Sequence, residues 1–173
     1  MYIIGMMKAA SFLILVMCTV SYSCKAGANA VEPAAAKSLR ILDKLPDNEN
    51  DWKKILTDQE YNILREKGTE RPFTGQYNKE KRSGIYRCAG CGHILFTSDT
   101  KFDSGTGWPS FYRPAKNSSV RELQDNSYGM NRIEVVCARC SGHLGHVFDD
   151  GPAPTGLRYC INSVSLQLDT QKK

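Results

Sequence analysis

One cysteine near the end of the chain stands outside any cysteine pair. Cys160 lies in the run Arg158–Ser163 (RYCINS), with Arg158 two residues before it and Asn162 two residues after it. If this run is a β-strand, residues two apart share a face, and the three side chains could point into one pocket. A thiol reacts as its thiolate, which a nearby guanidinium favours. The pattern indicates a cysteine nucleophile, with an inert buried cysteine as the alternative.

Two histidines upstream of this cysteine could supply acid–base chemistry. His143 and His146 lie three residues apart, next to glycines. Imidazole titrates near neutral pH, so two rings that face one site could donate and accept protons. They could instead bind a metal together with Asp149 and Asp150, but we favour the role in proton transfer.

A glycine-rich loop, Ser104–Phe111, contains a tryptophan that could line the same site. Glycines permit backbone conformations that other residues avoid, and Pro109 fixes the backbone that follows Trp108. An indole held rigidly in this way would form a wall for a small apolar group. The alternative is a tryptophan of the core.

Four more cysteines form two Cys-x-x-Cys pairs, Cys88/Cys91 and Cys137/Cys140. In each pair a predicted strand leads into the first cysteine, and a glycine follows the second within two residues. Two such turns supply the four sulfurs that Zn²⁺ prefers, and four thiolates leave no open position for catalysis. We therefore predict one structural zinc ion per chain; disulfides among these thiols are the alternative.

The elements that must position these residues follow an N-terminal leader, residues 1–30. Its uncharged apolar run, Ala9–Val20, is shorter than a membrane span of ~20 residues. It fits a secretory signal peptide with a cleavage site at Ala28–Ala30. We expect an exported protein in a periplasm, an extracellular space or a secretory lumen. An uncleaved anchor helix and a lipid on Cys24 are the alternatives, and no other membrane contact is expected.

Residues 31–50 are predicted to be a flexible linker and residues 51–169 a single domain. A capping box at Thr57 and Glu60 predicts a helix over residues 58–67, with a shorter helical turn before it. Past this helix, short alternating runs broken by turn residues predict strands. The predicted strands are Ile85–Cys88, His93–Phe96, Ile133–Cys137 and Val164–Leu168. The fold class is therefore mainly β, with one or two N-terminal helices.

Composition supports this organisation and argues against one class of partner. The 173 residues, 41% of them hydrophobic, suit one globular domain. Without Lys8 and Lys25 of the leader, the 23 Lys and Arg residues become 21, against 18 Asp and Glu. This small positive excess is scattered and forms no basic stripe, so no nucleic-acid partner is expected.

Three segments resemble the signature segments of B-type methionine sulfoxide reductases, which act on the R epimer of methionine sulfoxide. They are Lys101–Phe111, His143–Pro152 and Arg158–Ser163, and the resemblance covers about residues 51–168. It implies two antiparallel sheets that form a sandwich or barrel-like core, with N-terminal helices. The Cys-x-x-Cys pairs match the zinc-bearing members of the family.

The resemblance also implies what the matching residues do. Cys160 would be the nucleophile, and Arg158 would tune its thiolate. The sulfoxide oxygen and its water network would be held by His143, His146 and Asn162. A histidine, directly or through water, would protonate that oxygen while the thiolate attacks the sulfur, which leaves methionine and a sulfenic acid on the enzyme.

Two aromatic residues would contact the substrate in this family. Trp108 would receive the methyl group on sulfur, and Phe148 is the second predicted substrate-binding residue. The exposed pocket that the family implies favours oxidised proteins over free methionine sulfoxide. We expect a monomeric enzyme that repairs oxidised proteins.

The chain departs from the family in the tryptophan loop. Many relatives carry a resolving cysteine there, where this chain has Thr106. We therefore expect an external thiol, from a thioredoxin-like protein or a small molecule, to reduce the sulfenic acid on Cys160. Alternatively, Cys24 survives processing and acts as the resolving thiol, which cleavage or lipidation would prevent.

Two rival functions use fewer of these features. A non-catalytic zinc-ribbon binding module would need neither Cys160 nor the paired histidines. A secreted thiol–disulfide oxidoreductase would use one Cys-x-x-Cys pair for redox chemistry, which zinc bound at both pairs would exclude.

Overall fold

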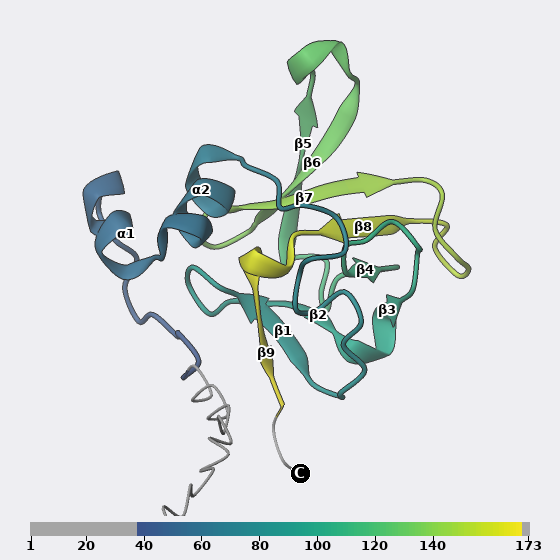
Figure 1. Cartoon of the computed structure of the whole chain (residues 1–173), viewed down its shortest axis with the longest axis horizontal. Helices are drawn as coiled ribbons and strands as arrows, with labels where there is room; N and C mark the ends of the chain where they lie inside the picture. The colour runs from purple at the N-terminus through teal and green to yellow at the C-terminus, as the bar shows by residue number, and fades with distance from the viewer. Residues whose placement is uncertain (1–37, 171–173) are drawn as a thin grey trace, which may run out of the picture. The chain divides into compact units, whose positions relative to one another are not determined.

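Two short helices open the part of the chain that the structure, a computed structural model, describes, residues 38–170 (Figure 1). Helix α1 spans Glu49–Ile55 and helix α2 spans Asp58–Glu66. At the start of α2 the Thr57 hydroxyl accepts the N–H of Glu60 at 3.2 Å, and the Glu60 carboxylate accepts the N–H of Thr57 at 3.0 Å. This is the predicted capping box, and it fixes where α2 begins.

The segment before these helices lies partly outside the described residues. The predicted signal peptide, residues 1–30, lies wholly outside them. Of the predicted linker, residues 31–50, the part from residue 38 onward is described. In that part Leu42 donates its backbone N–H to the carbonyl of Cys91 at 3.2 Å, so it lies against the first Cys-x-x-Cys turn. No helix in the described part of the chain is long and apolar enough to cross a membrane.

A small sheet holds three strands in the order β2-β1-β9, and both neighbours run antiparallel to β1. The strands are β1 (Ile85–Cys88), β2 (Ile94–Thr97) and β9 (Leu166–Asp169). The prediction that a strand starts at Val164 was wrong, because Ser163–Ser165 form the 3-10 turn η3. The buried Glu70 carboxylate accepts the backbone N–H of Ser163 at 2.6 Å and that of Val164 at 3.0 Å, which holds this turn outside the strand.

A larger sheet holds six strands in the order β3-β4-β8-β7-β6-β5, each antiparallel to its neighbours. They are β3 (Lys101–Phe102), β4 (Ser110–Phe111), β5 (Val120–Asp125), β6 (Arg132–Cys137), β7 (His143–Phe148) and β8 (Arg158–Ile161), with 3-10 turns η1 (Ser98–Thr100) and η2 (Ser127–Gly129). The hairpin of β5 and β6 extends away from the other strands (Figure 1). Strand β8, which carries Cys160, lies inside the sheet between β4 and β7.

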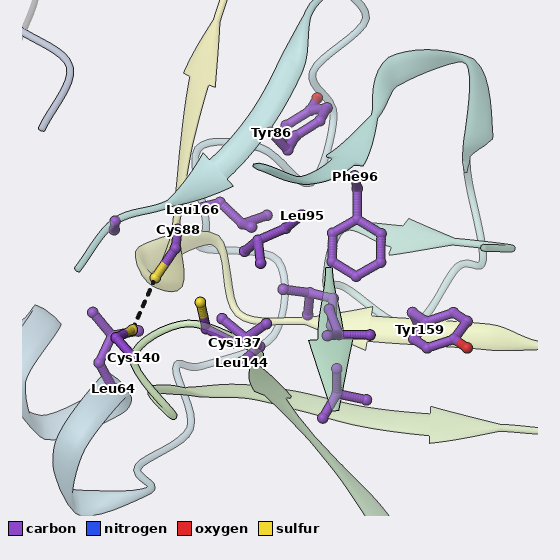
Figure 2. Packing of buried hydrophobic residues seen from close by; sticks show 14 of the residues in the cluster. Leu64, Tyr86, Cys88, Leu95, Phe96, Cys137, Cys140, Leu144, Tyr159 and Leu166 are labelled. Atoms are coloured by element: carbon purple, nitrogen blue, oxygen red, sulfur yellow. Dashed lines mark hydrogen bonds between the residues drawn. The ribbon is translucent and has the colours of Figure 1, made fainter. Parts of the chain in front are cut away.

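Aromatic side chains from both sheets meet in one core (Figure 2). Phe96 of the small sheet stacks on Phe111 of the large sheet, with 4.4 Å between ring centroids, and Tyr86 and Tyr159 pack beside them. Because alternate residues of a strand face opposite sides, Tyr159 in this core directs Cys160 to the other face of its sheet. The predicted fold class, mainly β with two antiparallel sheets and N-terminal helices, is confirmed.

Candidate active site

A β-bulge in β7 brings two histidines onto one face of the large sheet. The pairing of β6 with β7 skips Leu144, which is therefore an extra residue in β7. In a regular strand, residues three apart face opposite sides, but the bulge shifts the alternation by one. The rings of His143 and His146 lie 5.6 Å apart as a result. At Gly145 a Cβ would lie 2.0 Å from the carbonyl oxygen of Cys160, so only glycine lets β7 and β8 approach this closely.

A hollow of about 160 Å³ opens beside Cys160. Five of the seven predicted catalytic and substrate-binding residues line it, namely Trp108, His146, Phe148, Cys160 and Asn162. Thr69 and Arg132 also line it, and neither was predicted from the sequence. Cys160 is partly exposed here, so a substrate can reach it from solvent.

Arg158 does not line this hollow but is held close to its cysteine. Its guanidinium lies over the Phe148 ring, 4.3 Å from the centroid, and donates two hydrogen bonds of 2.8 Å to the Asp150 carboxylate. Asp150 raises the pKa of Arg158 against the effect of burial, and Cys160 raises it further. Arg158 is thus a fixed positive charge near the Cys160 sulfur. Asp150 is the ion-pair partner of this guanidinium.

His143 is the other predicted residue that does not line the hollow. It is buried, and its Nδ1 lies 2.8 Å from the Glu134 carboxylate, which also accepts a 2.8 Å hydrogen bond from Lys67. A carboxylate at this distance only accepts, so Nδ1 carries the proton. Burial lowers the pKa of His143, although Glu134 opposes the shift, so the ring is neutral at neutral pH.

His146 faces the hollow and has its own carboxylate partner. Its Nε2 lies 2.8 Å from Asp125, which also accepts hydrogen bonds from Arg132 at 2.7 Å and from the Ser127 hydroxyl at 2.6 Å. Ser127 and His146 hold the pKa of Asp125 well below its usual range, so this carboxylate is ionised at neutral pH. Asp125 therefore fixes the tautomer and the orientation of the His146 ring.

Sequence reasoning missed the carboxylates behind both histidines. One signal was present for Glu134, because Arg132 and Glu134 are polar residues at a spacing of two in an otherwise apolar strand. Such a spacing places both side chains on one face of β6. Asp125 lies at the end of β5 and gives no comparable signal, since its contact with His146 depends on the pairing of three strands.

Glu70 joins two of the predicted site residues. Its backbone N–H donates to the Asn162 side-chain oxygen at 3.0 Å, and its carbonyl accepts from the Trp108 indole N–H at 3.1 Å. The Asn162 amide also donates to the carbonyl of Leu144 at 3.0 Å, which ties it to the bulge. Both site residues are therefore fixed by backbone groups.

The four paired cysteines meet at one point, where β1 and β6 end. Their sulfur atoms all lie within 4.8 Å of one another, and the Cys88–Cys140 and Cys91–Cys137 separations are both 3.7 Å. Figure 2 shows three of the four, Cys88, Cys137 and Cys140, with the Cys88–Cys140 contact dashed. Four sulfurs around a tetrahedral ion with Zn–S bonds of ~2.3 Å lie about 3.8 Å apart, whereas a disulfide joins its sulfurs at ~2.05 Å. The donor set therefore fits a metal ion, and these four cysteines are free thiols.

Three arginines surround this cluster of thiols. They donate to carbonyls of the two Cys-x-x-Cys turns: Arg65 to Cys140 at 3.0 Å, Arg139 to Cys91 at 3.1 Å, and Arg40 to Ala89. Four thiolates around a divalent cation carry a net charge of about −2. The guanidinium groups are placed to offset that charge and to hold the turns together.

A larger hollow, of about 400 Å³, lies near Tyr112, Glu122 and Tyr159. Neither a thiol nor a histidine is among its lining residues. We therefore assign the chemistry to the smaller hollow beside Cys160.

Comparison with known proteins agrees with this arrangement. Residues 56–170 match the SelR domain family. Three relatives named peptide methionine sulfoxide reductase MsrB are similar to the chain. The protein of Methanosarcina barkeri is 64% identical over 128 residues, 73% of this chain and 89% of the relative. That of Bradyrhizobium diazoefficiens is 59% identical over 134 residues, which are 78% of this chain and 96% of the relative. That of Pseudomonas syringae pv. syringae is 61% identical over 127 residues, which are 73% of this chain and 97% of the relative.

Matches of this identity over most of both chains establish the relationship, and the four clustered thiols fit the zinc-bearing members that the sequence resembles. The chain belongs to the SelR family of B-type methionine sulfoxide reductases.

Proposed function

We propose that this methionine sulfoxide reductase acts on methionine-R-sulfoxide in oxidised proteins, which it repairs through attack of the Cys160 thiolate on the sulfoxide sulfur. The observation that carries the proposal is that a partly exposed thiol, an imidazole and an indole line one hollow. Each supplies one requirement of the reaction: a nucleophile, an acid and a wall for the methyl group.

The thiolate is the first requirement. Arg158 supplies a positive charge that interacts with the Cys160 sulfur, and a nearby cation favours the ionised thiol. The contacts of Arg158 with Asp150 and Phe148 keep this charge in place. We infer that Arg158 tunes the thiolate and also supports the aromatic wall.

The acid is the second requirement. His146 lines the hollow, and its Nε2 lies 2.8 Å from the Asp125 carboxylate, which orients the ring. His143 is buried and neutral behind it. We infer that His146, directly or through water, delivers the proton to the sulfoxide oxygen, and that His143 and Asn162 organise the surroundings of that oxygen.

The reaction then balances as a transfer of one oxygen atom. The Cys160 sulfur bonds to the substrate sulfur as His146 protonates the oxygen. That oxygen then passes to the Cys160 sulfur while the S–S bond breaks and leaves its electron pair on the substrate sulfur, which gives methionine and Cys160 sulfenic acid. The substrate sulfur is reduced by two electrons and the Cys160 sulfur is oxidised by two. One external thiol condenses with the sulfenic acid to a mixed disulfide and water, and a second thiol releases Cys160.

The size of the hollow supports protein-bound substrates. A hollow of about 160 Å³ holds the end of one side chain and leaves the rest of the substrate outside. Trp108 and Phe148 line it and would flank the methyl group on sulfur. Recognition would thus need little beyond the methyl sulfoxide group, as a repair enzyme for many proteins requires.

The positions of the other described thiols support an external reductant. In residues 38–170, every cysteine other than Cys160 belongs to the four-thiol cluster. Thr106 stands in the loop where the family resemblance implies a resolving cysteine in many relatives. We propose a thioredoxin-like protein or a small thiol as the reductant. Cys24, the alternative resolving thiol, lies outside the described residues.

Two further parts of the proposal concern the metal and the compartment. We propose that Cys88, Cys91, Cys137 and Cys140 hold one structural Zn²⁺, which would fasten the ends of β1 and β6 to each other. The leader pattern supports export of the enzyme, with a lipid on Cys24 as the alternative to cleavage after Ala30.

The Cys160→Ser variant is expected to lose turnover by at least about 10³-fold, because a serine hydroxyl is not ionised at neutral pH. Methionine formation from a peptide methionine-R-sulfoxide with dithiothreitol measures the loss. A matched peptide with methionine-S-sulfoxide is the control substrate and is expected to give no product with the native chain. Equal rates for variant and native chain would rule out Cys160 as the nucleophile.

The Asp125→Asn variant is expected to lower kcat about 10- to 100-fold, less than the full 10²–10⁴ of a general acid. The asparagine side chain is uncharged and can present either its oxygen or its N–H group to His146, so it no longer fixes the tautomer of the ring. Steady-state kinetics on the same peptide gives kcat. Asp47→Asn, at an exposed carboxylate paired with Lys44, is the control and is expected to keep the native rate. An unchanged kcat in Asp125→Asn would remove Asp125 from the mechanism.

The Thr106→Cys variant is expected to form a disulfide with Cys160 after one turnover. The Thr106 hydroxyl oxygen lies 3.7 Å from the Cys160 sulfur, so an introduced sulfur needs only a small movement to bond at ~2.05 Å. Peptide mass mapping without external thiol should find this disulfide in the variant, and a dimedone adduct of Cys160 in the native chain. Thr155→Cys is the matched control. A native Cys24–Cys160 disulfide would contradict the external reductant.

The Cys88→Ser variant is expected to bind no zinc and to lose several kcal/mol of unfolding free energy, because metal binding and folding are coupled. Metal content by mass spectrometry and urea unfolding measure the two effects. Cys160→Ser is the matched control and is expected to keep one zinc ion per chain and the native unfolding midpoint. A native protein free of zinc and holding disulfides at these cysteines would overturn the metal site.

A further inference from the structure

We propose that a chain of three hydroxyl groups, on Thr106, Ser104 and Ser110, stabilises the thiolate of Cys160. The Thr106 hydroxyl oxygen lies 3.7 Å from the Cys160 sulfur. The Ser104 oxygen lies 2.8 Å from that of Thr106 and 2.7 Å from that of Ser110. The Ser110 oxygen lies 3.2 Å from the carbonyl oxygen of Trp108, which ends this hydroxyl chain.

The hydrogen bonds of this hydroxyl chain can run in either of two directions, because each hydroxyl has one proton and can both donate and accept. With Cys160 as a thiol, each group donates away from the sulfur, and Ser110 donates to the Trp108 carbonyl. With Cys160 as a thiolate, each hydroxyl turns the other way, and Thr106 donates to the sulfur. The Cys160 proton leaves to solvent through the hollow, and each hydroxyl keeps its own proton. A hydrogen bond to the charged form favours that form, and groups in a chain strengthen one another.

The fold holds the hydroxyl chain in place at Ser110 and at the loop that carries Ser104 and Thr106. Ser110 is fully buried in β4 and pairs directly with Cys160 of β8 across the sheet. Gly105, with φ of 71°, turns the loop so that Thr106 and Ser104 lie side by side, and the Asp103 carboxylate accepts its N–H at 3.0 Å. The hydroxyl groups are therefore preorganised before any substrate binds.

Other charged groups also act on Cys160 and must be separated from the hydroxyl chain. His146 of β7 and Arg132 of β6 line the same hollow, and both contact Asp125. Arg158 of β8 lies two residues before Cys160 and supplies a positive charge that acts on it. None of these groups belongs to the loop that carries Thr106, so a substitution of Thr106 leaves them in place and reports the hydroxyl alone.

The test measures the pH dependence of the reaction of Cys160 with iodoacetamide, followed by mass spectrometry of the peptide that contains Cys160. The full chain is used, and no sulfoxide is present. Thr106→Val keeps the shape of the side chain and removes the hydroxyl, and it is expected to raise the midpoint by about one pH unit. Ser104→Ala leaves Thr106 without its donor and is expected to raise the midpoint by a smaller amount. Thr106→Ser is expected to restore the native midpoint.

Thr100→Val is the matched control. Thr100 is buried, and its hydroxyl donates to the carbonyl of Thr97 at 2.9 Å. Its loss is expected to lower stability as much as the loss of the Thr106 hydroxyl does, with no change in the midpoint. A control that shifts the midpoint as far as Thr106→Val does would show that any lost threonine hydroxyl has this effect, and the proposal would fall.

Two further outcomes would overturn the proposal. A folded Thr106→Val variant with the native midpoint would show that its hydroxyl does not act on the thiolate. A native midpoint for Ser104→Ala would show that no chain is involved, and this variant decides the question even if Thr106→Val does not fold. The proposal rests on the nucleophilic role of Cys160, but the assay reads the thiol without turnover, so failure of one can be told from failure of the other.

Discussion

The close approach of β7 and β8 determines the geometry of the whole site. It requires a glycine at position 145, because any Cβ there would meet the carbonyl oxygen of Cys160. The bulge at Leu144, one residue earlier, turns His143 and His146 to one face, and Asn162 donates to the Leu144 carbonyl. A thiol, two imidazoles and an amide are thus positioned by two adjacent features of β7, the bulge in its pairing with β6 and its close approach to β8. A regular β7 would place the two histidines on opposite faces of the sheet.

Carboxylates with fixed partners are the second feature on which the site depends. Glu134 supports His143, Asp125 supports His146, and the Glu70 carboxylate accepts two backbone N–H groups of the turn that follows Asn162. The first two carboxylates each also bind a cation: the buried Glu134 binds Lys67, and the partly exposed Asp125 binds Arg132. A buried charge such as that of Glu134 requires partners of this kind. These networks hold the imidazole rings rigidly, so that the orientation of each ring is fixed before substrate arrives.

How far the sequence predicted this site depended on the range of each contact. The capping box, the paired thiols and the Arg-x-Cys-x-Asn run are local patterns. Each was predicted from a few neighbouring residues. Glu70 was missed because its partner Asn162 is 92 residues away. The Glu70 carboxylate also binds the backbone N–H of Val164, which explains why the last strand begins after that residue. The bulge was missed because a skipped residue exists only relative to a neighbouring strand. Hydrophobic alternation cannot reveal such a register shift.

The arrangement of the sulfurs separates the two kinds of cysteine chemistry that the sequence left open. A thiol–disulfide oxidoreductase needs an accessible Cys-x-x-Cys pair, but Cys88, Cys91 and Cys137 are fully buried. Their spacing, together with Cys140, suits a shared metal and is too wide for an existing disulfide. Cys160 stands apart, partly exposed and near a guanidinium. A zinc-ribbon module would have no use for the carboxylates that orient the two histidines. One of those carboxylates is buried and the other partly exposed, and the imidazole that Asp125 orients lines the hollow with Cys160, which fits the enzyme better than the module.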